Sequence, residues 1–298
     1  MKPTNCRPLL SIVVLLFSFS VTSFSAVIPE TDGEIKIDGL LDEVAWQESK
    51  VVRLVQLVPV AGANASELSE VMLVHDGEAL YAAARFSDSE PEMVRANNLK
   101  RDDTTGDDLF GLVVDSFNDD KSALAFYTNP NGIRIDEAIS NDGEFSVGSP
   151  FNRNWNTFWD CSARRTANGW EAEMRIPFSS LRFKPDGGGV VMGVIAWRSI
   201  SRKSEVAVYP PLDGQKHNSH RRPSLAEDME LVGVAGGKQL LVTPYLLSGM
   251  SQYTEMAGDT KSVAVGESLG YGIVETQDAQ AGLDLKWGLS SDLTLDLT

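Results

Sequence analysis

The fold class is decided by residues 167–176, which read ANGWEAEMRI. After the Asn-Gly pair at 168–169, apolar residues alternate with charged residues up to Ile176. This period of two predicts a β-strand with one buried face, and the Asn-Gly pair predicts a hairpin turn before it. On that pattern Trp170 belongs to the core, whereas Glu171 and Glu173 form a row that faces solvent.

The same signals recur along the chain on both sides of this hairpin. Asp76-Gly77 separates two apolar runs, residues 118–121 separate another two, and residues 129–132, Asn-Pro-Asn-Gly, have the composition of a turn. Eight or more short strands at this spacing, with no credible long helix, predict an all-β fold. We expect an antiparallel β-sandwich of two sheets over residues 30–232.

Composition excludes several classes of protein. The 298 residues contain 26 Lys and Arg against 42 Asp and Glu, a net charge of −16. Nucleic acid is therefore not an expected partner, because a phosphate backbone requires a basic surface. The chain has only two cysteines, Cys6 and Cys161, which excludes a disulfide-rich scaffold and a four-cysteine zinc site.

The N-terminus has the plan of a secretory signal peptide over residues 1–26. Lys2 and Arg7 precede an apolar run at 9–17, and small residues follow, with Ser25 best placed for cleavage. The alternative is a single membrane anchor. No later stretch of about 20 apolar residues predicts a transmembrane helix. We expect an exported protein of the cell envelope, in the outer membrane or the periplasm.

Residues 233–298 differ in character from the sandwich. From Ala281 onward apolar residues alternate with polar residues and glycine, a pattern that is typical of outer-membrane β-barrel strands. The alternative is a soluble hairpin packed on the sandwich. The sequence stops at Thr298 within such a strand, and a few strands cannot close a barrel. We therefore expect the first strands of a truncated outer-membrane barrel.

Several segments together resemble one known family. They are residues 35–46 (IKIDGLLDEVAW), 75–81 (HDGEALY), 129–132 (NPNG), 169–183 (GWEAEMRIPFSSLRF) and 282–289 (GLDLKWGL). The chain is similar to family 9 carbohydrate-binding modules, in the version that precedes an outer-membrane barrel in long Gram-negative surface proteins. The resemblance implies a sandwich that binds polysaccharide or oligosaccharide, attaches to the outer membrane through the barrel, and is linked to polysaccharide catabolism. The family accompanies xylanases and other glycosidases as a non-catalytic part.

Aromatic side chains are the first candidates for a carbohydrate site, since the C–H groups of a pyranose pack on an aromatic face. Residues 152–160, NRNWNTFWD, place Trp155 and Trp159 among hydrogen-bonding side chains. Trp197, in the run 194–198, is a third candidate. For each of these tryptophans the alternative is a place in the core.

His75 and Arg101 complete the candidate carbohydrate site. In the family's sugar-clamping modules a tryptophan precedes the hairpin turn at 76–77, and here that position is His75. Histidine stacks on a sugar less well, and the alternative is an ordinary strand end. Arg101 can donate paired hydrogen bonds to a sugar hydroxyl or carboxylate, or else pair with Asp102.

Clustered carboxylates near Arg101 predict a structural calcium site. Asp107, Asp108 and Asp115 are the proposed ligands, because Ca²⁺ takes six to eight oxygen ligands. The spacing does not match a twelve-residue EF-hand loop. The alternative is a solvated acidic loop.

The sequence does not point to a specific catalytic arrangement, and we assign no catalytic residue. Asp136–Glu137 and Glu171–Glu173 are the only tidy carboxylate pairs, and the chain lacks a Gly-x-Ser-x-Gly nucleophile motif. Two alternatives to sugar binding stay open. One is a structural, barrel-associated module without sugar binding, which the histidine at position 75 motivates. The other is a hydrolase of O-glycosyl compounds.

Overall fold

The computed structural model describes residues 26–146, 148–184, 188–234, 240–257, 270–288 and 294–297. The predicted signal peptide, residues 1–26, lies outside the described residues except for Ala26. Strands dominate the described chain, and its helices are seven short 3₁₀ turns, none with the length and hydropathy of a membrane-spanning helix. The predicted all-β, antiparallel sandwich is confirmed.

The strands have the following bounds: β1 (Ala26–Ile28), β2 (Lys50–Arg53), β3 (Val55–Val58), β4 (Ser69–His75), β5 (Ala79–Ser87), β6 (Leu109–Asp115), β7 (Ala123–Thr128), β8 (Ile135–Ile139), β9 (Phe151–Asn152), β10 (Asp160–Thr166), β11 (Gly169–Pro177), β12 (Gly189–Ile200), β13 (Glu205–Tyr209), β14 (Glu227–Val232), β15 (Leu240–Ala257), β16 (Gly270–Gly288) and β17 (Thr294–Leu297). The 3₁₀ helices are η1 (Val44–Gln47), η2 (Pro91–Met93), η3 (Asn141–Gly143), η4 (Phe178–Ser180), η5 (Ser201–Lys203), η6 (Ser219–Arg221) and η7 (Pro223–Leu225).

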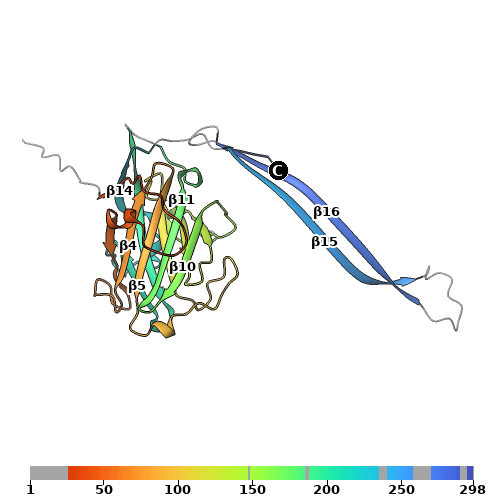
Figure 1. The fold of residues 1–298 in the computed structure, drawn as a ribbon, viewed down its shortest axis with the longest axis horizontal. Helices are drawn as coiled ribbons and strands as arrows, with labels where there is room; N and C mark the ends of the chain where they lie inside the picture. Colours follow the sequence, from red (N-terminus) through yellow and green to blue (C-terminus); the bar gives the residue numbers. More distant parts are fainter. Residues whose placement is uncertain are drawn as a thin grey trace, which may run out of the picture.

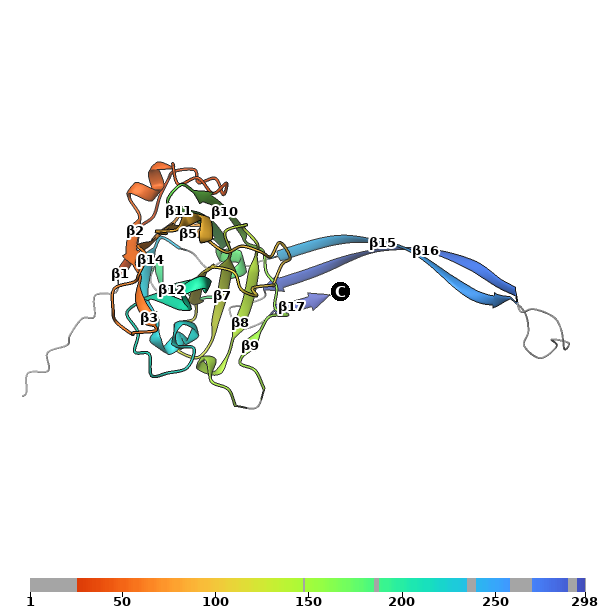
Figure 2. The same ribbon diagram turned by 90° about the horizontal axis from the view of Figure 1, so that it is seen from below.

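Two sheets form the sandwich (Figures 1 and 2). The large sheet has nine strands in the order β1-β14-β12-β6-β7-β8-β9, and β13 pairs with β12 and with β3. The small sheet has the order β10-β11-β5-β4-β2. All strand neighbours in the two sheets are antiparallel except β1 and β14, which run parallel.

The main core lies between the sheets and takes alternate side chains from each strand. Phe86 on the small sheet connects the two layers, with its ring centroid 5.4 Å from that of Phe110 on the large sheet and 4.7 Å from that of Trp170. Trp170, Ala172 and Met174 are fully buried in this layer. The alternation in residues 170–176 is thus the pattern of a strand whose apolar face meets a second sheet.

The three hairpins expected from turn chemistry all form. Asp76-Gly77 connects β4 to β5, residues 118–121 lie between β6 and β7, and Asn168-Gly169 connects β10 to β11. Gly77 has φ +80° and Gly169 has φ +140°, conformations that strongly favour glycine. These turns set the register that places the apolar face of each strand inward.

The outer face of the small sheet is also covered, which corrects the prediction of a solvent-facing acidic row. Residues 32–48 cross this face as a strap, and Trp46 packs there against Met72, Val74 and Tyr81. Glu173 is fully buried beneath the strap. Alternation identified the two faces of β11 correctly, but it could not show that both faces are covered.

Glu173 holds the strap through its carboxylate. It accepts hydrogen bonds from the backbone N–H of Asp38 at 3.1 Å and of Gly39 at 2.8 Å, and from Nε1 of Trp46 at 3.1 Å. Burial raises the pKa of Glu173 from its ordinary 4.5 to about 7, and the nearby Glu43 carboxylate acts in the same direction. The strap therefore depends on a buried group that titrates near neutral pH.

Strands β15, β16 and β17 form a separate antiparallel sheet that extends away from the sandwich (Figure 1). Val242 pairs with Leu285, which pairs with Leu297, so these side chains share one face. Thr243 pairs with Asp284 on the other face. This sheet is amphipathic, and much of its apolar face is exposed.

Candidate carbohydrate site

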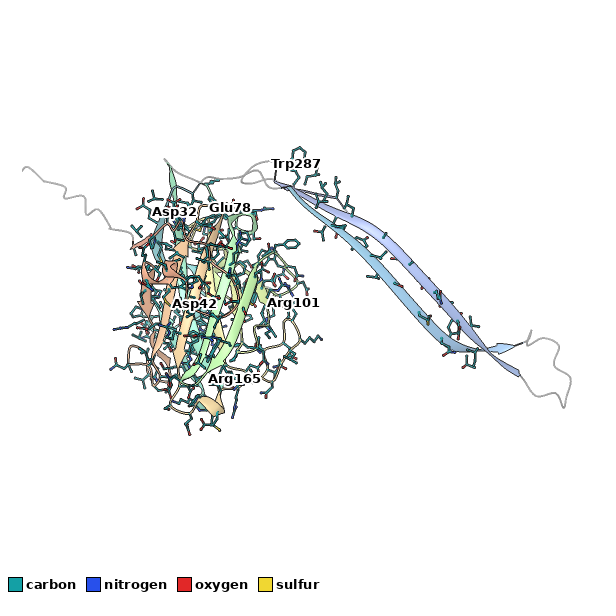
Figure 3. The ribbon with its side chains drawn as sticks, viewed as in Figure 1. Asp32, Asp42, Glu78, Arg101, Arg165 and Trp287 are labelled. Atoms are coloured by element: carbon teal, nitrogen blue, oxygen red, sulfur yellow. The ribbon has the colours of Figure 1, made fainter. Side chains whose placement is uncertain are left out.

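An open pocket of about 440 Å³ lies at the side of the sandwich, where Figure 3 labels Arg101. Its walls come from the segment between η2 and β6 and from the loop that follows β9. Three cations and two carboxylates line it, together with two threonines. The lining residues are Lys100, Arg101, Asp102, Asp103, Thr104, Thr105 and Arg153.

Arg101 is held at the pocket by partners from two other segments. Its Nη2 donates to a carboxylate oxygen of Asp136 on β8 and, at 2.9 Å, to Oδ1 of Asn156. Its Nε lies 3.5 Å from Asp102 Oδ2. The Arg101 side chain is still 36% exposed, so it is fixed in position and remains accessible to a ligand.

Asp136 anchors this arrangement from below. Its side chain is fully buried, and its second oxygen accepts the backbone N–H of Thr157 at 2.7 Å. Burial raises the pKa of Asp136, while the hydrogen bond from Thr157 and the charge of Arg101 oppose that rise. One carboxylate thus joins β8, Arg101 and the loop that carries Trp155.

Arg153 is fixed in a similar way on the other face of β8. Its Nε donates to Glu137 Oε2 at 3.2 Å, and Glu137 also accepts hydrogen bonds from the Tyr127 hydroxyl and from Arg221. Adjacent residues of a strand point to opposite faces. Asp136 and Glu137 therefore cannot act as a pair on one substrate, and each instead orients one arginine of the pocket.

The aromatic residues divide sharply between site and core. Trp155 is half-buried, with its ring centroid 6.3 Å from that of Phe126. Phe158, which the sequence did not single out, is 52% exposed two residues beyond Asn156. In the sequence these two rings flank Asn156, whose side chain accepts a hydrogen bond from Arg101.

Trp159, Trp197 and His75 were predicted to offer a ring to a sugar, but all three side chains are buried, which corrects the prediction at each. Trp159 is 1% exposed and packs with its centroid 5.3 Å from that of Phe126. Trp197 is 5% exposed on the outer face of the large sheet, beside Tyr127 and His220. It lies over Gly111, where a Cβ would overlap the indole.

His75 is fully buried at the end of β4, 6.2 Å from Phe178 between ring centroids. Burial lowers the pKa of this histidine, while the charges of Glu30 and Asp76 and a hydrogen bond with the Ile28 backbone oppose that change. His75 is therefore a core side chain in this structure and offers no face to a sugar.

The predicted calcium ligands do not come together. Asp108 and Asp115 lie at opposite ends of β6, about 20 Å apart at the rise of an extended strand. Asp108 accepts the backbone N–H of Ser201 at 2.7 Å, and Asp115 accepts that of Asp120 at 2.8 Å. Within the described ranges, no group of three His, Cys, Asp or Glu side chains has a metal-binding arrangement.

The residues that sequence reasoning missed carry polar side chains. Asp136 was visible only as half of a carboxylate pair, and Asn156 and Arg153 only as neighbours of Trp155. The signal that could have found them is their position. Arg153 and Asn156 lie on either side of Trp155 in the sequence, and Asp136 lies on β8, ahead of that loop. The sequence could not show that Arg101, on a distant segment, would reach them.

Proteins similar to this chain are found among solved structures. No family model and no curated protein matches the chain. The chain is similar to a family 9 carbohydrate-binding module from Caldicellulosiruptor kristjanssonii in complex with cellotriose, at 19% identity over 70% of this chain and 94% of that chain, with a TM-score of 0.44. For the same module with glucose the identity is 20%, the coverage 70% and 97%, and the TM-score 0.46. A protein from Bacteroides uniformis with a carbohydrate-binding designation is 13% identical over 62% and 87%, with a TM-score of 0.49.

Proposed function

We propose that the sandwich binds a saccharide at the pocket around Arg101. The observation that carries this proposal is the fixed but accessible guanidinium of Arg101, held by Asp136 and Asn156. A guanidinium that is already oriented can donate to sugar oxygens with little further loss of side-chain entropy. Asp102 and Asp103 line the same pocket and can accept hydrogen bonds from sugar hydroxyls.

The neighbouring aromatic rings supply the apolar part of the proposed site. Phe158 is exposed and Trp155 is half-buried next to the segment that contacts Arg101. A pyranose presents C–H groups on its faces and hydroxyls at its edge, so one ring and one group of charged side chains match its two parts. Because the pocket is open, we expect weak affinity for short saccharides.

Arg101→Ala is expected to weaken saccharide binding by about 10-fold or more, since a hydrogen bond to a charged group contributes about 1.5–3 kcal/mol. Glucose, cellotriose and a glycan array that includes xylan are the first probes, measured by calorimetry or ligand-observed NMR. The matched control is Arg165→Ala, an exposed arginine near the C-terminal end of β10 that does not line the pocket (Figure 3).

A second variant protects this test against loss of the fold. Arg101→Ala leaves the buried Asp136 without its cation, whereas Phe158→Ala changes only an exposed ring. We expect both variants to lose binding and Arg165→Ala to retain it. A folded wild-type protein that binds no glycan would overturn the proposal, as would equal affinity of all three variants and the wild type.

We also propose that the chain is exported to the cell envelope, that β15–β17 belong to an outer-membrane barrel, and that the protein serves polysaccharide catabolism. The amphipathic sheet supports the barrel, with exposed Leu246 and Leu283 on its apolar face. Fractionation of the producing cells tests this part of the proposal, with the protein expected in the envelope fraction. Recovery of the protein in the cytosol would contradict it.

A further inference from the structure

The segment that carries Arg101 is an irregular arm, residues 96–106, and one carboxylate closes it at its base. Asp107 is 3% exposed. Its Oδ1 accepts the backbone N–H of Asn97 at 2.7 Å. Its Oδ2 accepts from Asn98, through the backbone N–H at 3.2 Å and Nδ2 at 3.1 Å, and from Nδ2 of Asn129 at 2.8 Å.

The Asn-Pro-Asn-Gly turn at residues 129–132 forms hydrogen bonds with the same end of the arm. Nδ2 of Asn129 also donates to the carbonyl of Asn98 at 3.1 Å. Nδ2 of Asn131 donates to the carbonyls of Ala96 at 3.0 Å and of Asn98 at 3.2 Å. Two amide side chains of one turn therefore satisfy backbone carbonyls of the arm that would otherwise have only solvent as a partner.

The turn also lies next to the strand that anchors Arg101. It leads directly into β8, which carries Asp136, the anchor of Arg101. Arg134 follows the turn by two residues, and its Nη1 donates to the carbonyl of Trp159 at 2.8 Å. The turn is thus hydrogen-bonded to the arm, and Arg134, just after the turn, is hydrogen-bonded to the segment that follows Trp155.

We propose that Asp107, Asn129 and Asn131 are positioning residues that form a latch for the saccharide site. The inference rests on the proposed function, because it concerns the same pocket. Ordering an irregular segment on binding weakens affinity, whereas a segment that is ordered beforehand avoids this loss. The latch holds the arm in the position in which Arg101 pairs with Asp136 before any saccharide binds. The four N–H donors around Asp107 occupy its oxygens in the way that a cation would.

Asn131→Ala is the central test, because Asn131 is exposed and its amide donates twice to the arm. We expect faster amide hydrogen exchange over residues 96–106 and about 10-fold weaker binding of the best saccharide probe, at nearly unchanged global stability. Saturating saccharide should restore slow exchange in the arm. The matched control is Asn168→Ala, the exposed asparagine that precedes Gly169 in another turn.

The outcomes separate the latch from the proposed function. Unchanged exchange in the arm of Asn131→Ala would overturn the latch, as would faster exchange with wild-type affinity. Asp107→Asn, which puts an amide where four N–H donors converge, is expected to show the same two effects more strongly. If the wild-type protein binds no glycan, the proposed function fails, and the positioning role fails with it even where the exchange result shows a closed arm.

Discussion

Trp159→Ala is expected to lower the free energy of unfolding of the sandwich by about 3–5 kcal/mol, the usual effect of truncating a buried tryptophan. The indole is 1% exposed and packs on Phe126 in the main core. Small domains have only about 5–15 kcal/mol of stability, so this loss is a large part of the total. Urea unfolding followed by tryptophan fluorescence and circular dichroism measures it.

The neighbouring residue supplies the control for this experiment. Phe158 is 52% exposed, and Phe158→Ala is expected to change stability by less than about 0.5 kcal/mol while it weakens saccharide binding. Two adjacent aromatic residues thus separate a core role from a binding role. A stable Trp159→Ala variant that loses sugar binding would show that the indole contacts ligand and would contradict the burial described above.

Glu173→Gln is expected to change how stability depends on pH. The folded-state pKa of Glu173 is about 7, above its ordinary 4.5. Between these values the unfolded chain releases the proton while the folded protein keeps it, so the contribution of Glu173 falls as pH rises from 4.5 to 7. Below pH 4.5 this contribution is complete, and above pH 7 it is lost.

Glutamine keeps the carbonyl acceptor and cannot ionise, so the variant lacks this decline. Relative to the wild type, Glu173→Gln should gain on the order of 3 kcal/mol between pH 4 and pH 8, from about 1.4 kcal/mol per pKa unit. Unfolding by urea at several pH values measures the difference. Glu78→Gln, at a glutamate that is 84% exposed, is the control and should follow the wild-type curve. Parallel curves for Glu173→Gln and the wild type would refute the prediction.

Local chemistry made the fold predictable. Asp76-Gly77 and Asn168-Gly169 formed hairpins because their glycines adopt positive φ, and the alternation in 170–176 put Trp170 inward. The strap was not predictable from the same evidence. Its contact with Glu173 joins residues more than 100 positions apart, and a period of two does not report what covers each face.

The candidate site was predictable only where residue type and local sequence context decide it. Arg101 and Trp155 were selected for residue type and loop context. Arg101 lines the pocket, and Trp155 is half-buried in the loop that also holds Asn156, a partner of Arg101. Trp159 follows Trp155 by four residues in a segment of the same composition, but it immediately precedes β10 and its side chain is buried. Tertiary packing determines which of the two indoles is fully buried, and sequence composition does not report tertiary packing.

The parallel pairing of β1 with β14 has a consequence for how the protein folds. It places Ala26 beside Met229, so the first strand cannot find its partner until almost the whole sandwich has been synthesised. Contacts between such distant residues slow folding, because a long loop must close before they form. We therefore expect the β1–β14 pair to form late in folding. A growing chain that is released before Val232 should lack the complete pair.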